Sequence, residues 1–345
     1  MKSMKQVTRR RFLGTAAAGA VFAPVMIRAA AKAEFPLAFA TVAPRGSSFH
    51  QSFQTMAQRW KDVSGGRVEV TIYPGTQGGE PAIVRRMGIQ QLQGAMLTAG
   101  GMGQIDKAAT ALQLIPMAFQ TWAEVDHVRD TMRPRLETAF NQKGYQVLFW
   151  GDAGWVRWFT KKPVLHPADL KPMKIFAAAG EQEAVEILKD YYQPVALEPD
   201  KIFTALSTGL IEGVSLPAFL ANFTQVATLA KHMLDLRYAP VTGAMVVARK
   251  AWDRIPEDLR GKLQTVADEV GAEVRKSSRA EDDAAIVAMK EKQGLQVAVA
   301  TPEVVKEWRE VIEVAYPRLR GRIVPEALFD EVIALLKAFR AKGGA

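Results

Sequence analysis

The 345-residue sequence contains no cysteine and only four histidines. The absence of cysteine excludes disulfide bonds, cysteine-ligated zinc, iron–sulfur clusters and thiol nucleophiles. The histidines are isolated from one another along the chain, so they offer no cluster of the kind that binds a metal ion. We therefore expect no metal and no other cofactor.

Long apolar runs are missing from the body of the chain. Residues 202–223 come closest to a membrane-spanning segment, but they include Glu212. A spanning helix needs about 20 consecutive, predominantly apolar residues. We therefore expect no transmembrane helix after the first 33 residues.

Acidic residues are missing from the first 33 residues. That segment holds seven basic residues: Lys2, Lys5, Arg9, Arg10, Arg11, Arg28 and Lys32. The formal net charge is +9, so subtracting these seven leaves +2 for residues 34–345. A nearly neutral body excludes nucleic acid as a partner, because a phosphate backbone requires a concentrated basic surface.

The N-terminal segment has the features of an export signal. Residues 8–14 read Thr-Arg-Arg-Arg-Phe-Leu-Gly, an apolar stretch rich in Ala and Gly follows, and residues 31–33 offer the small residues of a cleavage site. Consecutive arginines before Phe-Leu resemble the twin-arginine (Tat) variant. A membrane anchor or a basic surface arm is the alternative, but the apolar run is short and contains Pro24. We predict that residues 1–33 are a Tat-type signal peptide and that the mature protein is soluble and periplasmic.

Catalytic signatures are also absent. The sequence has no G-x-S-x-G, no H-E-x-x-H and no G-x-x-x-x-G-K pattern. Gly100, Gly101 and Gly103 follow an apolar strand, but Asp106 stands where a dinucleotide-binding loop has its third glycine. The sequence therefore gives no indication of an enzyme.

What the chain does contain is an alternation of strand and helix patterns. Strands are predicted at 35–42, 68–72, 94–99, 145–150, 155–160, 194–197 and 241–248, and helices at 49–63, 122–142, 181–191, 201–207 and 256–293, with a further helix starting at Pro302. Such alternation indicates α/β lobes with largely parallel sheets. The stretch 256–293 would exceed 50 Å as one helix at about 1.5 Å per residue, which is longer than a single lobe. A cleft between two lobes is a common place for a small ligand.

Four segments resemble one family in order and separation. Residues 65–79 are similar to its G-G-R-V-x-V-x-x-Y-P-x-x-Q-L-G run, with Gly78 in place of Leu. Residues 114–119, 166–175 and 205–213 are similar to its L-P-Y-x-F, P-x-D-L-K-G-x-K-I-R and A-L-Q-T-G-x-V-D-G segments. The family is that of the DctP-like extracytoplasmic solute-binding proteins of TRAP (tripartite ATP-independent periplasmic) transporters.

The resemblance implies a two-lobed α/β fold like that of periplasmic binding proteins, with hinge strands and a long helix spanning both lobes. On this basis lobe I comprises residues 34–153 plus about 243–283, and lobe II comprises residues 154–242 plus about 284–345. The resemblance also implies that the protein delivers a small solute to a small and a large membrane subunit. It leaves the oligomeric state open.

Two departures from the family pattern bear on the ligand. Phe176 stands where the K-I-R arginine usually binds a ligand carboxylate, and Leu216 stands where a polar residue often precedes the proline. Arg157 lies near the position of a second ligand-binding arginine of the family. A buried carboxylate needs such a partner. We therefore expect either a small organic acid or a solute with a larger apolar or aromatic body and at most one carboxylate, held by Arg157.

The remaining expected ligand contacts surround these positions. They are Trp155, Trp158 and Phe219, together with Ser48, Phe49, Thr98 and Gly100 of lobe I. The alternative is that the aromatic residues pack in the core or between the lobes and that Arg157 forms a salt bridge. The rival functions are a Tat-exported periplasmic enzyme and a sensor or chaperone-like relative that uses the same cleft.

Overall fold

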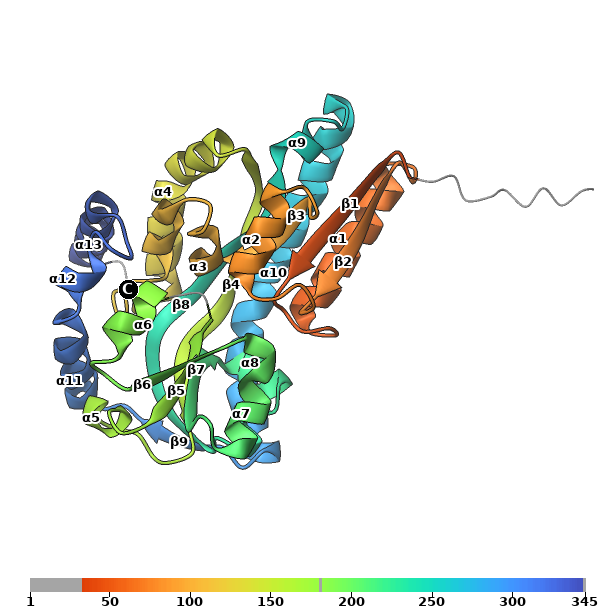
Figure 1. Ribbon diagram of the computed structural model, residues 1–345. Helices are drawn as coiled ribbons and strands as arrows, with labels where there is room; N and C mark the ends of the chain where they lie inside the picture. Colours follow the sequence, from red (N-terminus) through yellow and green to blue (C-terminus); the bar gives the residue numbers. More distant parts are fainter. Residues whose placement is uncertain (1–32, 180–181, 344–345) are drawn as a thin grey trace, which may run out of the picture. The chain divides into compact units, whose positions relative to one another are not determined.

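The computed structural model describes residues 33–179 and 182–343, so the predicted Tat signal lies outside the described residues apart from Ala33. The described residues form a nine-stranded sheet flanked by helices (Figure 1). The strands are β1 (Phe35–Thr41), β2 (Val68–Pro74), β3 (Gly94–Thr98), β4 (Tyr145–Thr160), β5 (Lys174–Ala178), β6 (Gln193–Leu197), β7 (Gly213–Pro217), β8 (His232–Ala248) and β9 (Gln296–Val299). Their order is β2-β1-β3-β8-β4-β7-β5-β6, and β9 pairs with β8.

The two long strands β4 and β8 join the lobes. The first part of β4 pairs with the end of β8 that lies beside β3, and the second part of β4 pairs with β7. We predicted a break in β4 at residues 151–154 and a start of β8 at residue 241, and both predictions are wrong. The strand continues because register shifts between Asp152 and Trp155 absorb the glycines. The hinge strands of the predicted fold are therefore continuous through both lobes.

The sheet is mixed rather than largely parallel. β1 is parallel to β2 and β3, and β5 is parallel to β6 and β7. β3, however, runs antiparallel to β8, and β4 runs antiparallel to β7 and β8. The prediction of parallel pairing thus holds for the outer strands of each lobe and is wrong at the shared centre.

The longer helices begin where the sequence supplies a capping side chain. Ser47, Thr121 and Thr301 each accept a hydrogen bond from a backbone N–H in the first turn of the helix that follows. The α-helices are α1 (Ser48–Val63), α2 (Glu80–Gly88), α3 (Ala99–Met102), α4 (Trp122–Gln142), α5 (Pro167–Leu170), α6 (Gln182–Leu188), α7 (Ile202–Thr208), α8 (Ala218–Phe223), α9 (Arg249–Trp252), α10 (Glu257–Lys292), α11 (Pro302–Glu313), α12 (Tyr316–Leu319) and α13 (Glu326–Ala341). Short 3-10 helices cover Lys107–Leu112, Pro199–Lys201 and Val226–Thr228.

The long helix α10 spans both lobes, as predicted. It has 36 residues, which corresponds to about 54 Å. Near its start the indole of Trp60 in α1 donates to the carbonyl of Leu263, and just past its end Gln293 donates to Asn222 of α8. The predicted apolar stripe is buried: Leu259, Leu263, Val266, Val270 and Val274. One helix therefore packs on elements of both lobes (Figure 1).

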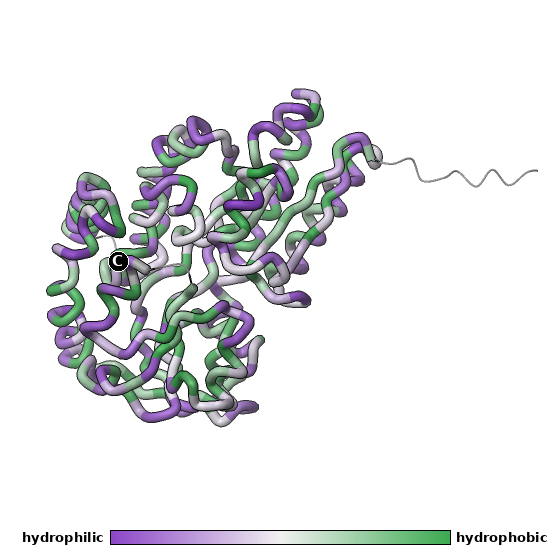
Figure 2. The backbone as a smooth tube through the Cα atoms, viewed as in Figure 1, coloured by the Kyte–Doolittle hydropathy of each residue, from purple (hydrophilic) through white to green (hydrophobic). Residues whose placement is uncertain are grey.

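Apolar residues concentrate on the strands, while the helices alternate apolar and polar positions (Figure 2). The C-terminal helix α13 was not predicted. It buries Phe329, Val332 and Leu336 against a core that includes residues of α4. Within the part of the chain that the structure describes, no helix is long and apolar enough to cross a bilayer.

Candidate functional site

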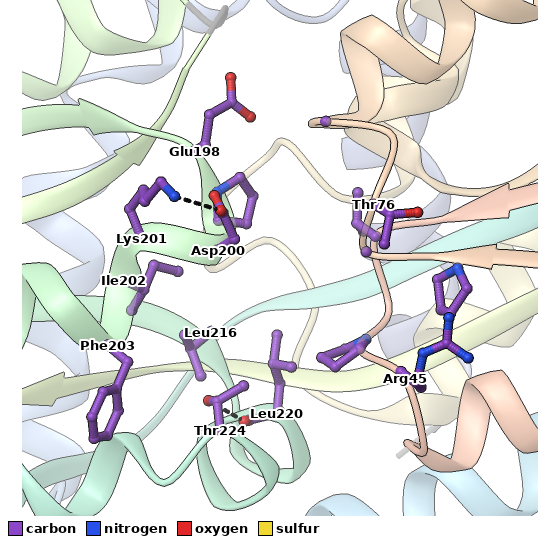
Figure 3. Close-up of a pocket in the computed structure, with 16 residues that line it drawn as sticks. Arg45, Thr76, Glu198, Asp200, Lys201, Ile202, Phe203, Leu216, Leu220 and Thr224 are labelled. Carbon is purple, nitrogen blue, oxygen red and sulfur yellow. Dashed lines mark hydrogen bonds and ion pairs between the residues drawn. The ribbon is translucent and has the colours of Figure 1, made fainter.

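A cavity of about 690 Å³ lies where the loops after β1 and β2 face lobe II (Figure 3). The lobe I wall comes from residues 42–45 and 74–78, where Gly75 and Gly78 adopt positive φ angles of 62° and 81°. Glycine adopts such angles without steric cost, which lets the loop turn sharply beside the cavity. Leu216, together with residues of α7 and α8, forms the lobe II wall. The cavity therefore lies between the two lobes.

The charged groups of this first cavity lie at its rim. Lys201 pairs with Asp200 at 2.8 Å, and both side chains are exposed. Arg45 is exposed and has no ion-pair partner among the described residues. Glu198 accepts a hydrogen bond from the backbone N–H of Gly79 at 3.1 Å. Gly79 is the N-cap residue of α2, so this carboxylate of lobe II contacts the positive end of a lobe I helix.

A second cavity of about 290 Å³ lies on the other side of β7. Ser215 lines it, whereas its neighbour Leu216 lines the first cavity, because successive side chains of a strand point to opposite faces. Phe176, Trp158 and Tyr238 supply aromatic surface. None of its lining residues that the structure describes carries a charge.

Three of the predicted ligand contacts line these two cavities. Leu216 lies in the first, and Phe176 and Trp158 lie in the second. The Trp158 ring has its centroid 5.6 Å from Tyr192 and 5.3 Å from Tyr238, with edge-on contacts to both. Leu216 and Phe176, the two departures from the family pattern, thus line cavities on opposite faces of the sheet in lobe II.

Other predicted contacts pack between or within the lobes and line neither cavity. The rings of Phe49 and Phe219 are both buried, with centroids 5.2 Å apart, and they join α1 to α8. Trp155 packs on Trp122 with centroids 4.7 Å apart. The Ser48 hydroxyl is buried and has no hydrogen-bond partner in the described part of the chain. These aromatic residues make packing contacts in the structure, and their predicted contact with a solute stays a prediction.

Thr98 and Gly100 lie at the end of β3 and the start of α3, and they too line neither cavity. Thr98 donates from its backbone N–H and from its hydroxyl to the Glu80 carboxylate, both at 2.6 Å. Burial raises the pKa of Glu80, and the hydrogen bonds from Thr98 oppose that rise. The polar groups of Thr98 are therefore occupied by Glu80 in this structure.

Arg157 lies on the other face of β4 from the aromatic cavity. Val156 and Trp158 line that cavity, so strand alternation directs Arg157 away from it. Its guanidinium Nη1 lies 2.7 Å from the Asp282 carboxylate and its Nε lies 3.3 Å from that of Asp235. Arg157 thus forms a salt bridge here, and its predicted role with a solute carboxylate stays a prediction.

Asp282 is a buried structural residue that was not predicted from the sequence. Besides Arg157, it accepts hydrogen bonds from the backbone N–H groups of Trp155 and Phe219, both at 3.1 Å. It follows Val270, Val274 and Ser278 at four-residue intervals on the buried face of α10. A carboxylate on the buried face of a helix indicates a structural ion pair, because buried carboxylates are almost always paired.

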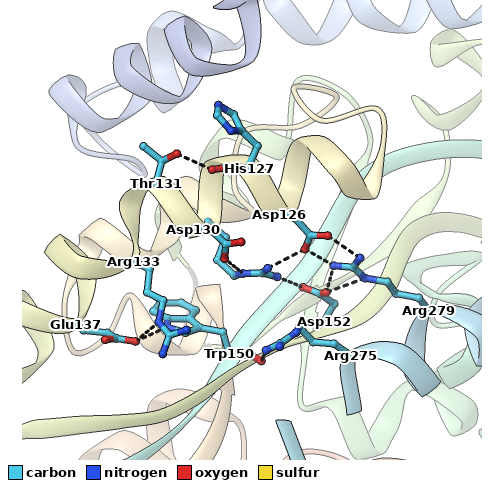
Figure 4. A network of polar contacts seen from close by, with 11 residues as sticks. Asp126, His127, Asp130, Thr131, Arg133, Glu137, Trp150, Asp152, Arg275 and Arg279 are labelled. Carbon is cyan, nitrogen blue, oxygen red and sulfur yellow. Dashed lines mark hydrogen bonds and ion pairs between the residues drawn. The ribbon is translucent and has the colours of Figure 1, made fainter. Parts of the chain in front are cut away.

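A second network of charges ties α4 to β4 and α10 (Figure 4). Arg279 donates from Nε to Asp152 at 2.9 Å and from Nη1 to Asp126 at 2.9 Å. Burial raises the pKa of Asp152, although Arg279 and Arg129 oppose the rise. For Asp126 burial also acts upward, but hydrogen bonds from Arg279 and Arg129 outweigh it and lower its pKa. These ion pairs connect β4 to α4 and α10.

The described residues include no group of three or more His, Asp or Glu side chains that could hold a metal ion. Two α/β lobes, two shared hinge strands, a helix spanning both and a cleft between them define a protein of the periplasmic-binding-protein class. Residues 39–321 match the model of the family described as bacterial extracellular solute-binding protein, family 7 (DctP), and the chain belongs to that family.

Relatives agree with this assignment. The chain is 23% identical over 343 residues to the C4-dicarboxylate-binding periplasmic protein DctP of Rhodobacter capsulatus, covering 96% of this chain and 99% of the relative. It is similar to the TRAP periplasmic solute-binding protein of Desulfovibrio salexigens with bound orotic acid (TM-score 0.78, 18% identity, 89% and 99% covered). It is also similar to that of Shewanella oneidensis with bound succinate (TM-score 0.80, 15% identity, 87% and 99% covered).

The protein is therefore a TRAP periplasmic solute-binding protein, and the family is one of binding proteins rather than enzymes. The predicted family, fold and periplasmic location are confirmed. The residue bounds of the two lobes stay a prediction.

Proposed function

We propose that this protein captures a small solute with an apolar or aromatic body between its lobes and delivers it to the small and large TRAP membrane subunits. Phe176 carries the proposal. It stands where the family pattern has a carboxylate-binding arginine, and it lines a cavity without a charged wall. A carboxylate buried there would lack a partner, which makes its transfer from water unfavourable.

The relatives bind solutes that carry carboxylates, in contrast to the apolar or aromatic body proposed here. The related structures hold succinate and orotic acid, and the curated relative is named for C4 dicarboxylates. If the solute of this protein retains one carboxylate, the cationic groups available are Arg45 and Lys201 at the rim of the first cavity. Arg157 would first have to release Asp282. An organic acid with its carboxylate at that rim and its apolar body inside fits the first cavity.

Capture is proposed to proceed by hinge closure. A solute that contacts both lobes binds the closed state better than the open state, and it shifts the population by that difference. The walls of the first cavity come from both lobes, so a solute there meets the condition. β4 and β8 cross between the lobes and carry the hinge.

The test is a thermal-shift screen of the mature protein with succinate, other dicarboxylates, and aromatic and branched-chain acids, read together with native mass spectrometry. A ligand at 100 times its Kd stabilises the folded state by about 2.7 kcal/mol, which raises the Tm by several degrees. We expect aromatic or branched compounds to stabilise the protein more than succinate does. Strong stabilisation by C4 dicarboxylates alone would refute the apolar body, and chemical conversion of a bound compound would refute pure binding.

A further inference from the structure

The aromatic cavity beside β7 differs from the first cavity in its chemistry. Its walls come from β4, β5, β7, β8 and α6, from the segment Gln113–Pro116, and from Leu319 and Ile323 near the C-terminus. Four aromatic side chains line it: Trp158, Phe176, Tyr192 and Tyr238. Hydroxyl, amide and indole groups are its only polar side chains among the described lining residues.

The indole N–H of Trp158 is a buried hydrogen-bond donor of this cavity. The side chain is 2% exposed, and its Nε1–H has no hydrogen-bond partner among the described residues. Of the other buried indoles, those of Trp60 and Trp308 donate to the carbonyls of Leu263 and Leu165, whereas that of Trp155, which does not line this cavity, also has no partner among the described residues. A buried donor without an acceptor costs free energy. A ligand that supplies the acceptor therefore binds more tightly, because it removes that cost.

Tyr238 adds a second donor to the same wall. Burial raises the pKa of its phenol, so the hydroxyl stays protonated and remains a donor at any physiological pH. Its backbone carbonyl accepts from the N–H of Met117 at 2.7 Å, which fixes this part of β8 against lobe I. The cavity thus combines aromatic surface with neutral donors.

We propose that this cavity holds an uncharged aromatic ring that bears a hydrogen-bond acceptor, such as a neutral carbonyl or amide oxygen, which accepts the Trp158 indole N–H. Aromatic rings favour offset or edge-on contact with the surrounding rings. A carboxylate on the same ring would be buried without a counter-charge. This inference rests on the proposed function and names the chemistry of the apolar part of the solute.

The direct test is isothermal titration calorimetry of the mature protein with benzamide and benzoate, two probes of nearly equal shape that differ in charge, and with succinate. We expect benzamide to bind at least about tenfold more tightly than benzoate or succinate, a difference of about 1.4 kcal/mol. Benzoate binding equally or more tightly overturns the proposal. A lack of benzamide binding at millimolar concentration overturns it as well.

Variants locate the binding. Trp158→Phe keeps a ring and removes the donor, so we expect it to weaken benzamide binding several-fold. Phe176→Arg should reverse the preference in favour of benzoate. If that variant does not fold, Phe176→Leu removes the ring instead and should weaken benzamide binding. The control is Trp252→Phe, a buried indole in the other lobe that packs on Trp60, which should leave the benzamide Kd unchanged. An unchanged Kd in Trp158→Phe overturns the assigned contact.

The outcome separates this inference from the proposed function. Small-angle X-ray scattering reports whether any solute of the screen closes the two lobes. Closure with a different solute, without benzamide binding, overturns the aromatic cavity and keeps the transport role. Absence of closure and binding for every compound in the screen would count against both.

Discussion

The carboxylate of Asp282 in α10 lies 2.7 Å from the guanidinium of Arg157 in β4, and both side chains are 2% exposed or less. The same carboxylate also accepts from the backbone of Trp155 and of Phe219, at the start of α8. One side chain therefore fastens the long helix to the shared strand and to a lobe II helix. It does so at the point where β4 passes from one lobe to the other.

We expect Asp282→Asn to lower the free energy of unfolding by about 3–5 kcal/mol, because it leaves the Arg157 charge buried without its closest partner. Urea unfolding followed by circular dichroism measures the loss. The double variant Arg157→Met, Asp282→Leu removes both charges and should cost less than the single variant. If the double variant costs as much as the two single variants added together, the pair is not coupled.

Gly154 of β4 tests how closely the strand packs on the Asp282 carboxylate. Its φ is +90°, and a Cβ at this position would overlap the Asp282 carboxylate. Gly144 has a similar φ of +84° but open space around it. Gly144→Ala should therefore cost only the backbone strain, about 1 kcal/mol, whereas Gly154→Ala should cost clearly more. Equal losses of unfolding free energy would show that the bulge accommodates the methyl group.

Glu198 is expected to favour closure. Its carboxylate contacts the N–H of Gly79 at the start of α2, on the far side of the first cavity. Glu198→Gln removes the charge that the helix N-terminus favours, which is worth about 0.3–1 kcal/mol for an exposed group. We expect the Kd of a solute found in the screen to rise by about two- to fivefold, with little change in Tm. The matched control, Glu310→Gln on the exposed face of α11, should leave the Kd unchanged.

The sequence predicted the elements whose signals are local. α4 has the predicted bounds 122–142, because Thr121 caps it and its apolar positions repeat at helical spacing. The long helix was predicted to within one residue at each end, because its apolar stripe is uninterrupted up to Val274. The predicted strands at residues 35–42 and 94–99 differ from β1 and β3 by one residue each.

The hinge could not be predicted in the same way. Residues 151–154 read as a turn, and the chain stays extended there because Asp282, 127 positions beyond Trp155, binds the Trp155 N–H. The contacts of Arg157 could not be predicted from the sequence either. A shift of one residue along a strand changes the face that a side chain occupies, and a similarity to a motif does not fix that register. Phe176 and Leu216 follow closely on the similar segments 166–175 and 205–213, which fixes their alignment better, and each lines a cavity.

The ion pair between His166 and Glu307 gives the protein a pH-dependent contact between α5 and α11. His166 Nδ1 lies 2.6 Å from the Glu307 carboxylate, and the hydrogen bond and charge of Glu307 raise the pKa of His166 above its usual 6.5. A raised folded-state pKa means that the contact stabilises the fold fully below pH 6.5 and that the gain is lost as pH rises through the folded-state value.

We therefore expect Glu307→Gln to bring the His166 pKa down toward its usual value, which an NMR titration of the imidazole protons measures directly. The variant should also make the Tm less dependent on pH between 6 and 8. Glu310→Gln, one turn further along α11 and paired with Lys306, is the matched control and should lower the His166 pKa much less. An equal effect of the two variants would mean that the general charge of the helix, and not the contact with Glu307, sets the titration of His166.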